Sequence, residues 1–448
     1  MTNIKIKNLV LFLFDSVIFF FSLYLTLYLR YKLFGIEDVS GVNQHFINHL
    51  PHFIIIFIIF FLIFYINYLY NLRIMTSFKK LVRLSLSSLG VSILFSTLYF
   101  YLNVSATIAP RTNLFLFLII YTIIFLLWRY FFFLKIHKRM GKSQVIIIGN
   151  NELTNKLMEE INKHSSLGYE LNSVIRHKED LGKLESIIKE KDTYHIVFSG
   201  NLNDDVEVRN ILFKYLPQKI NFFSYPDFYE ILTEKIPVEA INQEWFLNNL
   251  KEASRNYYNF SKRFFDIFLS LLFLLITLAF WPLIALLIKL NSKGPVFFKQ
   301  KRLGNQGKIF YIKKFRSMTT SNNNFSPTEK EDKRITKIGK WLRVTRIDEL
   351  PQLLNILKGE MSFIGPRPER PEIVSQLEKS IPFYRTRLLI KPGLTGWDQV
   401  SGEYHSPSLE DSLEKLQYDL YYIKNRSLYL DLNIILKTIS IVLGRKGR

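Results

Sequence analysis

Two adjacent carboxylates, Asp348 and Glu349, are the side chains of this sequence best suited to chemistry. They open the segment DELPQ at 348–352. A short predicted helix follows, and after it comes the turn GPRP at 365–368. A carboxylate can attack phosphorus or help to hold Mg²⁺, and arginine binds phosphate oxygens in pairs. The pattern therefore predicts chemistry on a phosphorylated substrate.

The same pair has a structural interpretation. Residues 348–357 are typical of a short helix with Asp348 as its N-cap, Pro351 in its first turn and Gly359 just after its end. A carboxylate at an N-cap is favoured in its charged form by the helix N–H groups. An isolated Asp-Glu pair would be weak evidence for a site, but four arginines surround this one in the sequence and favour phosphate binding: Arg343, Arg346, Arg367 and Arg370.

The composition indicates a membrane protein. Of the 448 residues, 48% are apolar, and the 40 Phe and 24 Tyr exceed what a soluble core needs. The formal net charge of +21 suits anionic headgroups or phosphorylated substrates, and we expect no nucleic acid partner. The chain has no cysteine, which excludes disulfides, a thiolate nucleophile and cysteine-metal sites.

Four apolar stretches predict a membrane α-helical bundle of four spans in a first domain at 1–140. Each approaches the roughly 20 residues needed to cross a bilayer. The first has no small-residue cleavage site and is expected to be retained. Lysine and arginine precede the first span, separate the second from the third and follow the fourth, so both ends of the bundle are expected in the cytoplasm. The stretches lie near residues 8–29, 50–70, 84–104 and 113–134.

Residues 141–252 predict a degenerate Rossmann-like α/β domain. Strand candidates at 145–148, 171–175, 195–199 and 220–224 alternate with amphipathic helices, the first of them at 152–163. Dinucleotide binding needs several glycines near the pyrophosphate, whereas the first strand-to-helix turn supplies one, and a glutamate there would repel phosphate. We therefore favour a structural or regulatory role for this domain over cofactor binding.

A further apolar run at 264–290 is interrupted by Pro282 and has basic residues on both sides. A straight fifth span would place the two soluble parts on opposite faces of the membrane. A helix that enters, bends at Pro282 and returns would keep both on one face, and we favour this re-entrant form. The basic, aromatic and glycine-punctuated segment at 294–318 that follows is typical of a β-hairpin at a lipid boundary.

Together these residues resemble the bacterial sugar transferase family, the monotopic polyprenyl-phosphate phosphoglycosyl transferases of the undecaprenyl-phosphate hexose-1-phosphate transferase type. The resemblance covers about residues 260–445 and implies an α/β monotopic catalytic domain at 258–448 with a re-entrant helix near 264–290. Four spans and a degenerate α/β domain before it look like the large subgroup of the family. The motifs are Lys262-Arg263 with Asp266, the membrane segment with Pro282, KFRSM at 314–318, DELPQ at 348–352, GEMS at 359–362, GPRP at 365–368 and KPGLTGW at 391–397.

The resemblance implies that Asp348 attacks the β-phosphorus of a UDP-sugar, that UMP leaves, and that polyprenyl phosphate then takes the phosphosugar. Glu349 would position Mg²⁺. It further implies the initiating step of exopolysaccharide, capsule or O-antigen assembly, at a bacterial inner membrane with the catalytic domain facing the cytoplasm. The partners would be a UDP-sugar, polyprenyl phosphate and membrane lipid. The phosphate-binding residues would be Lys314, Arg316, Arg343 and Arg367.

Several points stay open at this stage. Asp398, Ser401 and Glu403 depart from the usual family pattern, which puts sugar or nucleotide contacts there in doubt. The stretch at 430–443 suits either an amphipathic helix on anionic lipid or a buried packing helix. The sugar, the glycan and a homo-oligomeric state are not specified by any motif.

Two other functions compete with the transferase. A membrane-bound nucleotide-sugar dehydratase or epimerase would need an NAD site and a Tyr-x-x-x-Lys pair on one helix. That spacing occurs at Tyr215 with Lys219, around Pro217, and at Tyr258 with Lys262, where the membrane run begins. A noncatalytic scaffold for glycan-assembly enzymes is the second alternative.

Overall fold

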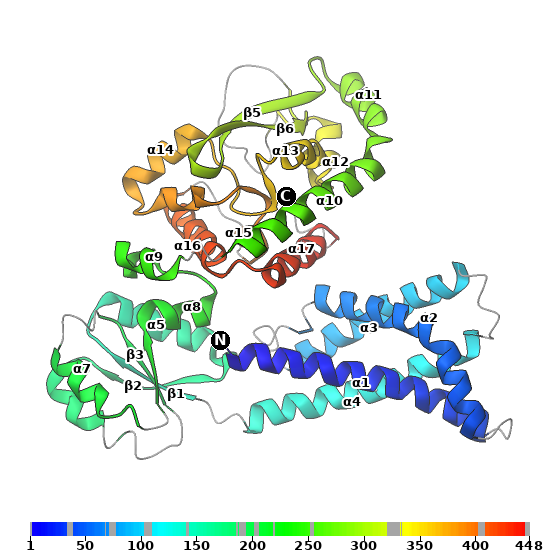
Figure 1. Cartoon of the computed structure of the whole chain (residues 1–448), viewed down its shortest axis with the longest axis horizontal. Coiled ribbons are helices and arrows are strands. Elements are labelled where there is room, and N and C mark those ends of the chain that lie inside the picture. The colour runs from blue at the N-terminus through cyan, green and yellow to red at the C-terminus, as the bar shows by residue number, and fades with distance from the viewer. Residues whose placement is uncertain are drawn as a thin grey trace. The chain divides into compact units, whose positions relative to one another are not determined.

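The computed structural model describes two compact units, Met1–Leu232 and Thr233–Arg448 (Figure 1). Each is considered by itself below. The described residues are 2–33, 39–67, 69–70, 78–102, 110–139, 143–184, 187, 194–200, 206–217, 220–250, 255–319, 332, 334–401 and 408–443.

The first unit starts with four long helices, and its apolar segments are long enough to cross a membrane. The second segment begins at Gly41 rather than near residue 50, and the other three lie close to the predicted positions. The described part of the chain therefore has the predicted four-helix membrane region. The helices are α1 (Thr2–Leu33), α2 (Val39–Ile66), α3 (Phe78–Leu102) and α4 (Pro110–Arg139).

A buried ion pair joins α1 to α4. Arg129 Nη2 lies 2.5 Å from Asp15 Oδ2, and the two residues are 1% and 3% exposed. Trp128 Nε1 donates to Asp15 Oδ1 at 3.1 Å, and Arg129 Nη1 donates to the carbonyl of Leu69. Buried charges need such partners because an unpaired charge in an apolar interior is costly.

The predicted parallel sheet follows the helices in the first unit. Its strand order is β2-β1-β3-β4, and every strand candidate from the sequence is present. The strands are β1 (Ser143–Ile148), β2 (Tyr169–Ile175), β3 (Tyr194–Phe198) and β4 (Ile220–Ser224), with helices α5 (Glu152–Lys163), α7 (Val206–Phe213) and α8 (Tyr225–Thr233).

The carboxyl ends of β1 and β3 are linked by side-chain hydrogen bonds. Asn151 caps α5 by accepting from the Thr154 amide and donates its side-chain N–H to the Ser199 carbonyl. The hydroxyls of Thr154 and Ser199 hydrogen-bond each other at 2.7 Å. Gly149 has a φ of +148°, and a Cβ there would lie 1.8 Å from Ser199 Oγ. The polar groups at the first strand-to-helix turn are thus engaged with one another.

The second unit begins with the connector 233–250 and then two helices, α10 (Asn256–Leu278) and α11 (Trp281–Asn291). These two helices meet at a 62° bend. Pro282 lies in the first turn of α11, where its missing N–H costs no hydrogen bond, so the proline starts a new helix instead of interrupting one. The division at Leu232 lies earlier than the boundary at 252 that the sequence suggested.

The rest of the second unit positions the acidic segment between a hairpin and two short helices. The predicted hairpin is present, with Lys314 paired to Phe298 across the strands. The elements are β5 (Phe297–Leu303), β6 (Ile309–Phe315), α12 (Lys337–Val344), the 3-10 helix η5 (Ile347–Gln352), α13 (Leu353–Lys358), β7 (Ser362–Ile364), α14 (Pro371–Ser380), η6 (Tyr384–Leu389), β8 (Gly393–Thr395), α15 (Trp397–Ser401), α16 (Leu409–Asn425) and α17 (Leu428–Leu443).

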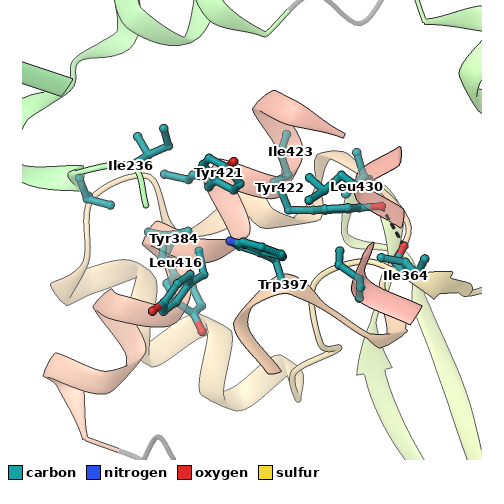
Figure 2. Packing of buried hydrophobic residues seen from close by; sticks show 14 of the residues in the cluster. Ile236, Ile364, Tyr384, Trp397, Leu416, Tyr421, Tyr422, Ile423 and Leu430 are labelled. Atoms are coloured by element: carbon teal, nitrogen blue, oxygen red, sulfur yellow. Dashed lines mark hydrogen bonds between the residues drawn. The ribbon is translucent and has the colours of Figure 1, made fainter. Parts of the chain in front are cut away.

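The largest core of this unit surrounds Trp397 and takes more of its buried residues from α16 than from any other element, with Ile236 of the connector at its edge (Figure 2). Helix α17 buries Leu430 and Ile434 in this core and exposes Leu428 and Leu432. One face of the helix therefore packs in the core, as the packing interpretation predicts, and contact of the other face with lipid stays a prediction.

Candidate active site

Strand β6 and the 3-10 helix η5 bring Lys314 to the acidic pair. Lys314 Nζ donates to Glu349 Oε1 at 2.7 Å, although the two residues are 35 positions apart. The packing of Leu350 and Leu353 against apolar residues of the hairpin and of α11 and α12 holds η5 in place. The alternation of side chains along β6 accounts for Lys314, because Phe310 and Ile312 on the same strand face are buried in that packing.

Three cationic groups surround one oxygen of Glu349. Besides Lys314, Arg367 Nη2 lies 3.3 Å and Arg346 Nη1 lies 3.9 Å from Glu349 Oε1. Burial opposes ionisation, but Lys314, Arg367 and Arg346 together hold the pKa of Glu349 well below its usual range. Glu349 is therefore ionised at any physiological pH.

Asp348 is in a different environment, which the sequence did not predict. Arg346, with a φ of +58°, precedes η5 at its N-cap, and Asp348 lies inside the 3-10 helix. The expectation that Asp348 is the N-cap was wrong. Burial, with Glu349 next to it, raises the pKa of Asp348 to about 6, whereas N-cap bonds would have lowered it. Lys314, Arg343 and Arg346 act in the opposite direction.

The Asp348 carboxylate is 6% exposed, and its Oδ1 has no hydrogen-bond partner among the described residues. A buried, poorly solvated carboxylate oxygen is more nucleophilic than a hydrogen-bonded one, and the adjacent cations can bind the charge of a phosphate. At pH 7 Asp348 is ionised in most molecules because its pKa is about 6. The arrangement suits attack on a phosphorus atom.

The turn that carries Arg367 is held by three glycines. A Cβ on Gly393 would lie 2.1 Å from the Gly365 nitrogen, and one on Gly396 would lie 2.5 Å from the Gly365 oxygen. This close approach lets the Gly365 amide donate to the Thr395 carbonyl at 3.0 Å. The glycines of GPRP and KPGLTGW therefore join the two motifs in space and direct Arg367 to Glu349.

Helix α10 is bonded to both sides of the site. Arg263 donates to the carbonyls of Ile356 and Leu357 at the end of α13, at 2.7 Å each. Asp266 accepts from Ser362 Oγ and from the Phe363 amide at 3.0 Å each, just before the turn with Arg367. The first part of the bent helix pair is thus tied to both segments that carry site residues.

Arg316 lies apart from the carboxylates. Its Nη2 donates to the carbonyls of Ile288 and Ser292 at the end of α11, at 3.4 and 2.7 Å. Among the described residues its Nε and Nη1 have no partner, and the side chain is buried. Of the four predicted phosphate ligands, the structure therefore brings Lys314 and Arg367 to Glu349, places Arg343 within electrostatic reach of Asp348, and places Arg316 at the end of α11.

A known protein family matches the segment that contains this site, and known proteins match much of the chain. The profile of the family described as bacterial sugar transferase matches residues 257–445. A UDP-glucose:undecaprenyl-phosphate glucose-1-phosphate transferase of Xanthomonas campestris pv. campestris is 32% identical over 329 residues, 68% of this chain and 67% of the relative. The chain belongs to the bacterial sugar transferase family.

Other known transferases match the chain over different lengths. The protein of the same name from Klebsiella pneumoniae is 33% identical over 318 residues, 67% of this chain and 68% of the relative. A UDP-N-acetylgalactosamine-undecaprenyl-phosphate N-acetylgalactosaminephosphotransferase of Aeromonas hydrophila is 40% identical over 220 residues, 49% of this chain. That match spans 51% of the Aeromonas protein, about half of its length. Family membership makes this chain an enzyme of the transferase class.

Sequence reasoning gave less weight to two residues of this transferase site. Arg346 could equally have faced solvent, and only the folded η5 shows its guanidinium near Glu349. Arg387 was not singled out, yet its Nη2 donates to the Arg367 carbonyl at 3.1 Å and lies 2.8 Å from Asp419 Oδ2. The sequence feature that could have pointed to Arg387 is its position four residues before the KPGLTGW motif.

Proposed function

We propose that this enzyme transfers a sugar-1-phosphate from a UDP-sugar to polyprenyl phosphate, giving a polyprenyl-diphosphate-sugar and UMP. The observation that carries the proposal is the pair of neighbouring carboxylates in unlike environments. Glu349 is neutralised by Lys314, Arg367 and Arg346, whereas Asp348 Oδ1 has no partner among the described residues. The names of the relatives from Xanthomonas and Klebsiella support the two substrates.

In the first proposed step an ionised oxygen of Asp348 forms a bond to the β-phosphorus of the UDP-sugar. The bond from that phosphorus to the oxygen bridging the α-phosphate breaks, and UMP leaves with the electron pair. In the second step an oxygen of polyprenyl phosphate attacks the same phosphorus, and the aspartyl oxygen leaves as a carboxylate. Each step brings two anions together, which Lys314, Arg346 and Arg367 assist by offsetting charge.

Glu349 is the residue that would hold Mg²⁺. The described residues contain no group of three or more His, Cys, Asp or Glu side chains that could enclose a metal. Mg²⁺ is usually held by one or two carboxylates together with substrate phosphates, so a single buried carboxylate beside a phosphate site fits that mode. When bound, the ion would neutralise part of the diphosphate charge. All three cationic contacts of Glu349 reach Oε1.

We further propose that α10 and α11 form a re-entrant membrane element and that the catalytic unit faces the cytoplasm of a bacterial inner membrane. Support comes from the 62° bend and from the exposed apolar side chains of α10 and α11, among them Phe268, Leu275 and Leu286. The element would present the phosphate of the lipid acceptor at the depth of Asp348. The product would start the assembly of an exopolysaccharide, a capsule or an O-antigen.

The decisive experiment is UMP release from a panel of UDP-sugars by the purified full chain, with and without polyprenyl phosphate. Lipid-dependent release from one sugar, lost in Asp348→Asn, would establish the reaction and identify the sugar. Trapping a labelled phosphosugar on the wild type but not on Asp348→Asn would establish the covalent intermediate. Glycan export and partner binding that stay unchanged in Asp348→Asn would instead favour a scaffold.

A further inference from the structure

The connector 233–250 lies before the part of the chain that matches the family, yet it is built into the catalytic unit. Ile236 is fully buried and Val238 nearly so in the core around Trp397. The Ile236 amide donates to the Gln417 carbonyl of α16 at 3.1 Å, and Lys235 forms an ion pair with Glu414 of the same helix.

The connector also makes a direct hydrogen bond to Trp397. The Trp397 Nε1–H donates to the Glu234 carbonyl at 3.2 Å. Glu234 has a φ of +57°, a conformation that residues other than glycine seldom adopt and that neighbouring contacts must stabilise. Trp397 is 2% exposed, and Lys437 Nζ of α17 lies 4.1 Å from its ring centroid. The connector and α17 therefore fix this ring from different segments.

Trp397 is continuous with the turn that carries Arg367. A Cβ on Gly396, next in the chain, would lie 2.5 Å from the Gly365 oxygen, so Gly396 packs directly against Gly365 and has no room for a side chain. Gly365 is two residues from Arg367, whose Nη2 lies 3.3 Å from Glu349 Oε1. A chain of direct contacts therefore runs from the connector through Trp397 and two glycines to the phosphate-binding arginine.

We propose that the connector is a positioning strap for the donor-diphosphate site: by holding Trp397 it fixes the turn of Gly365 and Arg367. This inference rests on the proposed function, because it assigns Arg367 to the donor phosphates. Glu234 and Ile236 are positioning residues in this scheme. They act through Trp397 and do not touch substrate.

A purely structural role would make a different prediction. If the connector only adds buried surface, then loosening it lowers the melting temperature without changing how folded enzyme binds donor. If it positions Arg367, loosening it raises KM for the UDP-sugar, while kcat changes less because Asp348 and Glu349 lie in η5. Because the contact is misaligned rather than lost, KM is expected to rise by about five- to tenfold.

The test compares variants of the full chain in lipid nanodiscs. Ile236→Ala removes a buried anchor of the strap, and Leu247→Ala is the matched control because Leu247 is in the same connector but 83% exposed. We expect the KM increase for Ile236→Ala with kcat within about twofold, recovery in Ile236→Val, and wild-type values for Leu247→Ala. Trp397→Phe keeps an aromatic side chain but removes the N–H donor, and it should also raise KM.

Hydrogen exchange gives a readout that does not depend on activity. In Ile236→Ala and Trp397→Phe, the amides of 363–367 and 393–397 should exchange faster than in the wild type, and those of η5 should not. Unchanged exchange there, together with an unchanged KM in folded variants, would overturn the strap. If the wild type releases no UMP from any sugar, the proposed function fails, and the exchange comparison still decides whether the connector fixes the turn.

Discussion

Replacing Asp348 by asparagine is expected to stabilise the folded protein at neutral pH while abolishing transfer. Burial raises the pKa of Asp348 from 3.8 to about 6. Because the folded state binds the proton more tightly than the unfolded chain, the raised pKa of Asp348 opposes folding; this cost grows as the pH rises from 3.8 and is complete above about pH 6. The shift of about 2.2 units (6 − 3.8) at 1.36 kcal/mol per unit corresponds to about 3 kcal/mol at pH 7.5. This is an upper limit, because the new amide also needs hydrogen-bond partners.

A carboxylate in an ion pair usually has a lowered pKa, whereas that of Asp348 is raised. The stabilisation by Asp348→Asn therefore depends on pH in a specific way. At pH 4.5 the folded protein is protonated at Asp348, and the unfolded chain gains little free energy by ionising because this pH is less than one unit above 3.8, so the stabilisation by Asp348→Asn falls to about 1 kcal/mol. For a unit of this size about 1 kcal/mol shifts the melting temperature by roughly 2–4 °C. The expected rise is therefore roughly 6–12 °C at pH 7.5 and roughly 2–4 °C at pH 4.5.

The assay is thermal unfolding of the full chain in detergent at both pH values, followed by tryptophan fluorescence. Glu349→Gln is the matched control. It removes the partner of the buried Lys314, so its melting temperature should fall at neutral pH. A lower melting temperature for Asp348→Asn at pH 7.5, or an equal rise at both pH values, would refute the proposed electrostatic environment of Asp348.

Four further outcomes are expected. Because the attacking group is ionised Asp348, UMP release should fall about tenfold per pH unit below pH 6, and a rate that stays flat to pH 4.5 would contradict a nucleophile with the raised pKa. Lys314→Met removes a cation that lowers the pKa of Asp348, so the acid limb of that profile should move to higher pH in the same assay; an unmoved limb would count against the contact. A chelator should stop transfer and added Mg²⁺ should restore it, whereas transfer that survives exhaustive EDTA would remove the metal role of Glu349. Since the chain has no cysteine, Lys340→Cys on the exposed face of α12 should react with an impermeant maleimide only from the cytoplasmic side, and reaction from the other side would indicate a straight fifth span.

The elements with strong periodicity were predictable because each depends on its own residues. The apolar spans, the four parallel strands and the hairpin all follow from local patterns of side chains. Pro282 was also informative, since a proline in an apolar run must either bend a helix or begin one, and here it lies in the first turn of α11.

The environment of the site was not predictable, because it depends on contacts between distant segments. Nothing near Asp348 in the sequence shows that burial would raise its pKa, and Lys314, which acts in the opposite direction, lies more than thirty residues earlier. Arg316 belongs to the same motif as Lys314 but meets the end of α11. The buried side chains of the connector gave no signal either, because an Ile and a Val on either side of a proline look like any linker to a folded domain.

The ion pair of Asp15 and Arg129 has a consequence for how the protein is made. Each residue lies one to two helical turns from the end of its span, and a charged residue within a membrane helix is costly to insert without a partner. Asp15 is synthesised more than a hundred residues before its partner, so its charge in α1 stays without Arg129 until α4 emerges from the ribosome. Membrane insertion of the bundle is therefore expected to be completed by its last helix.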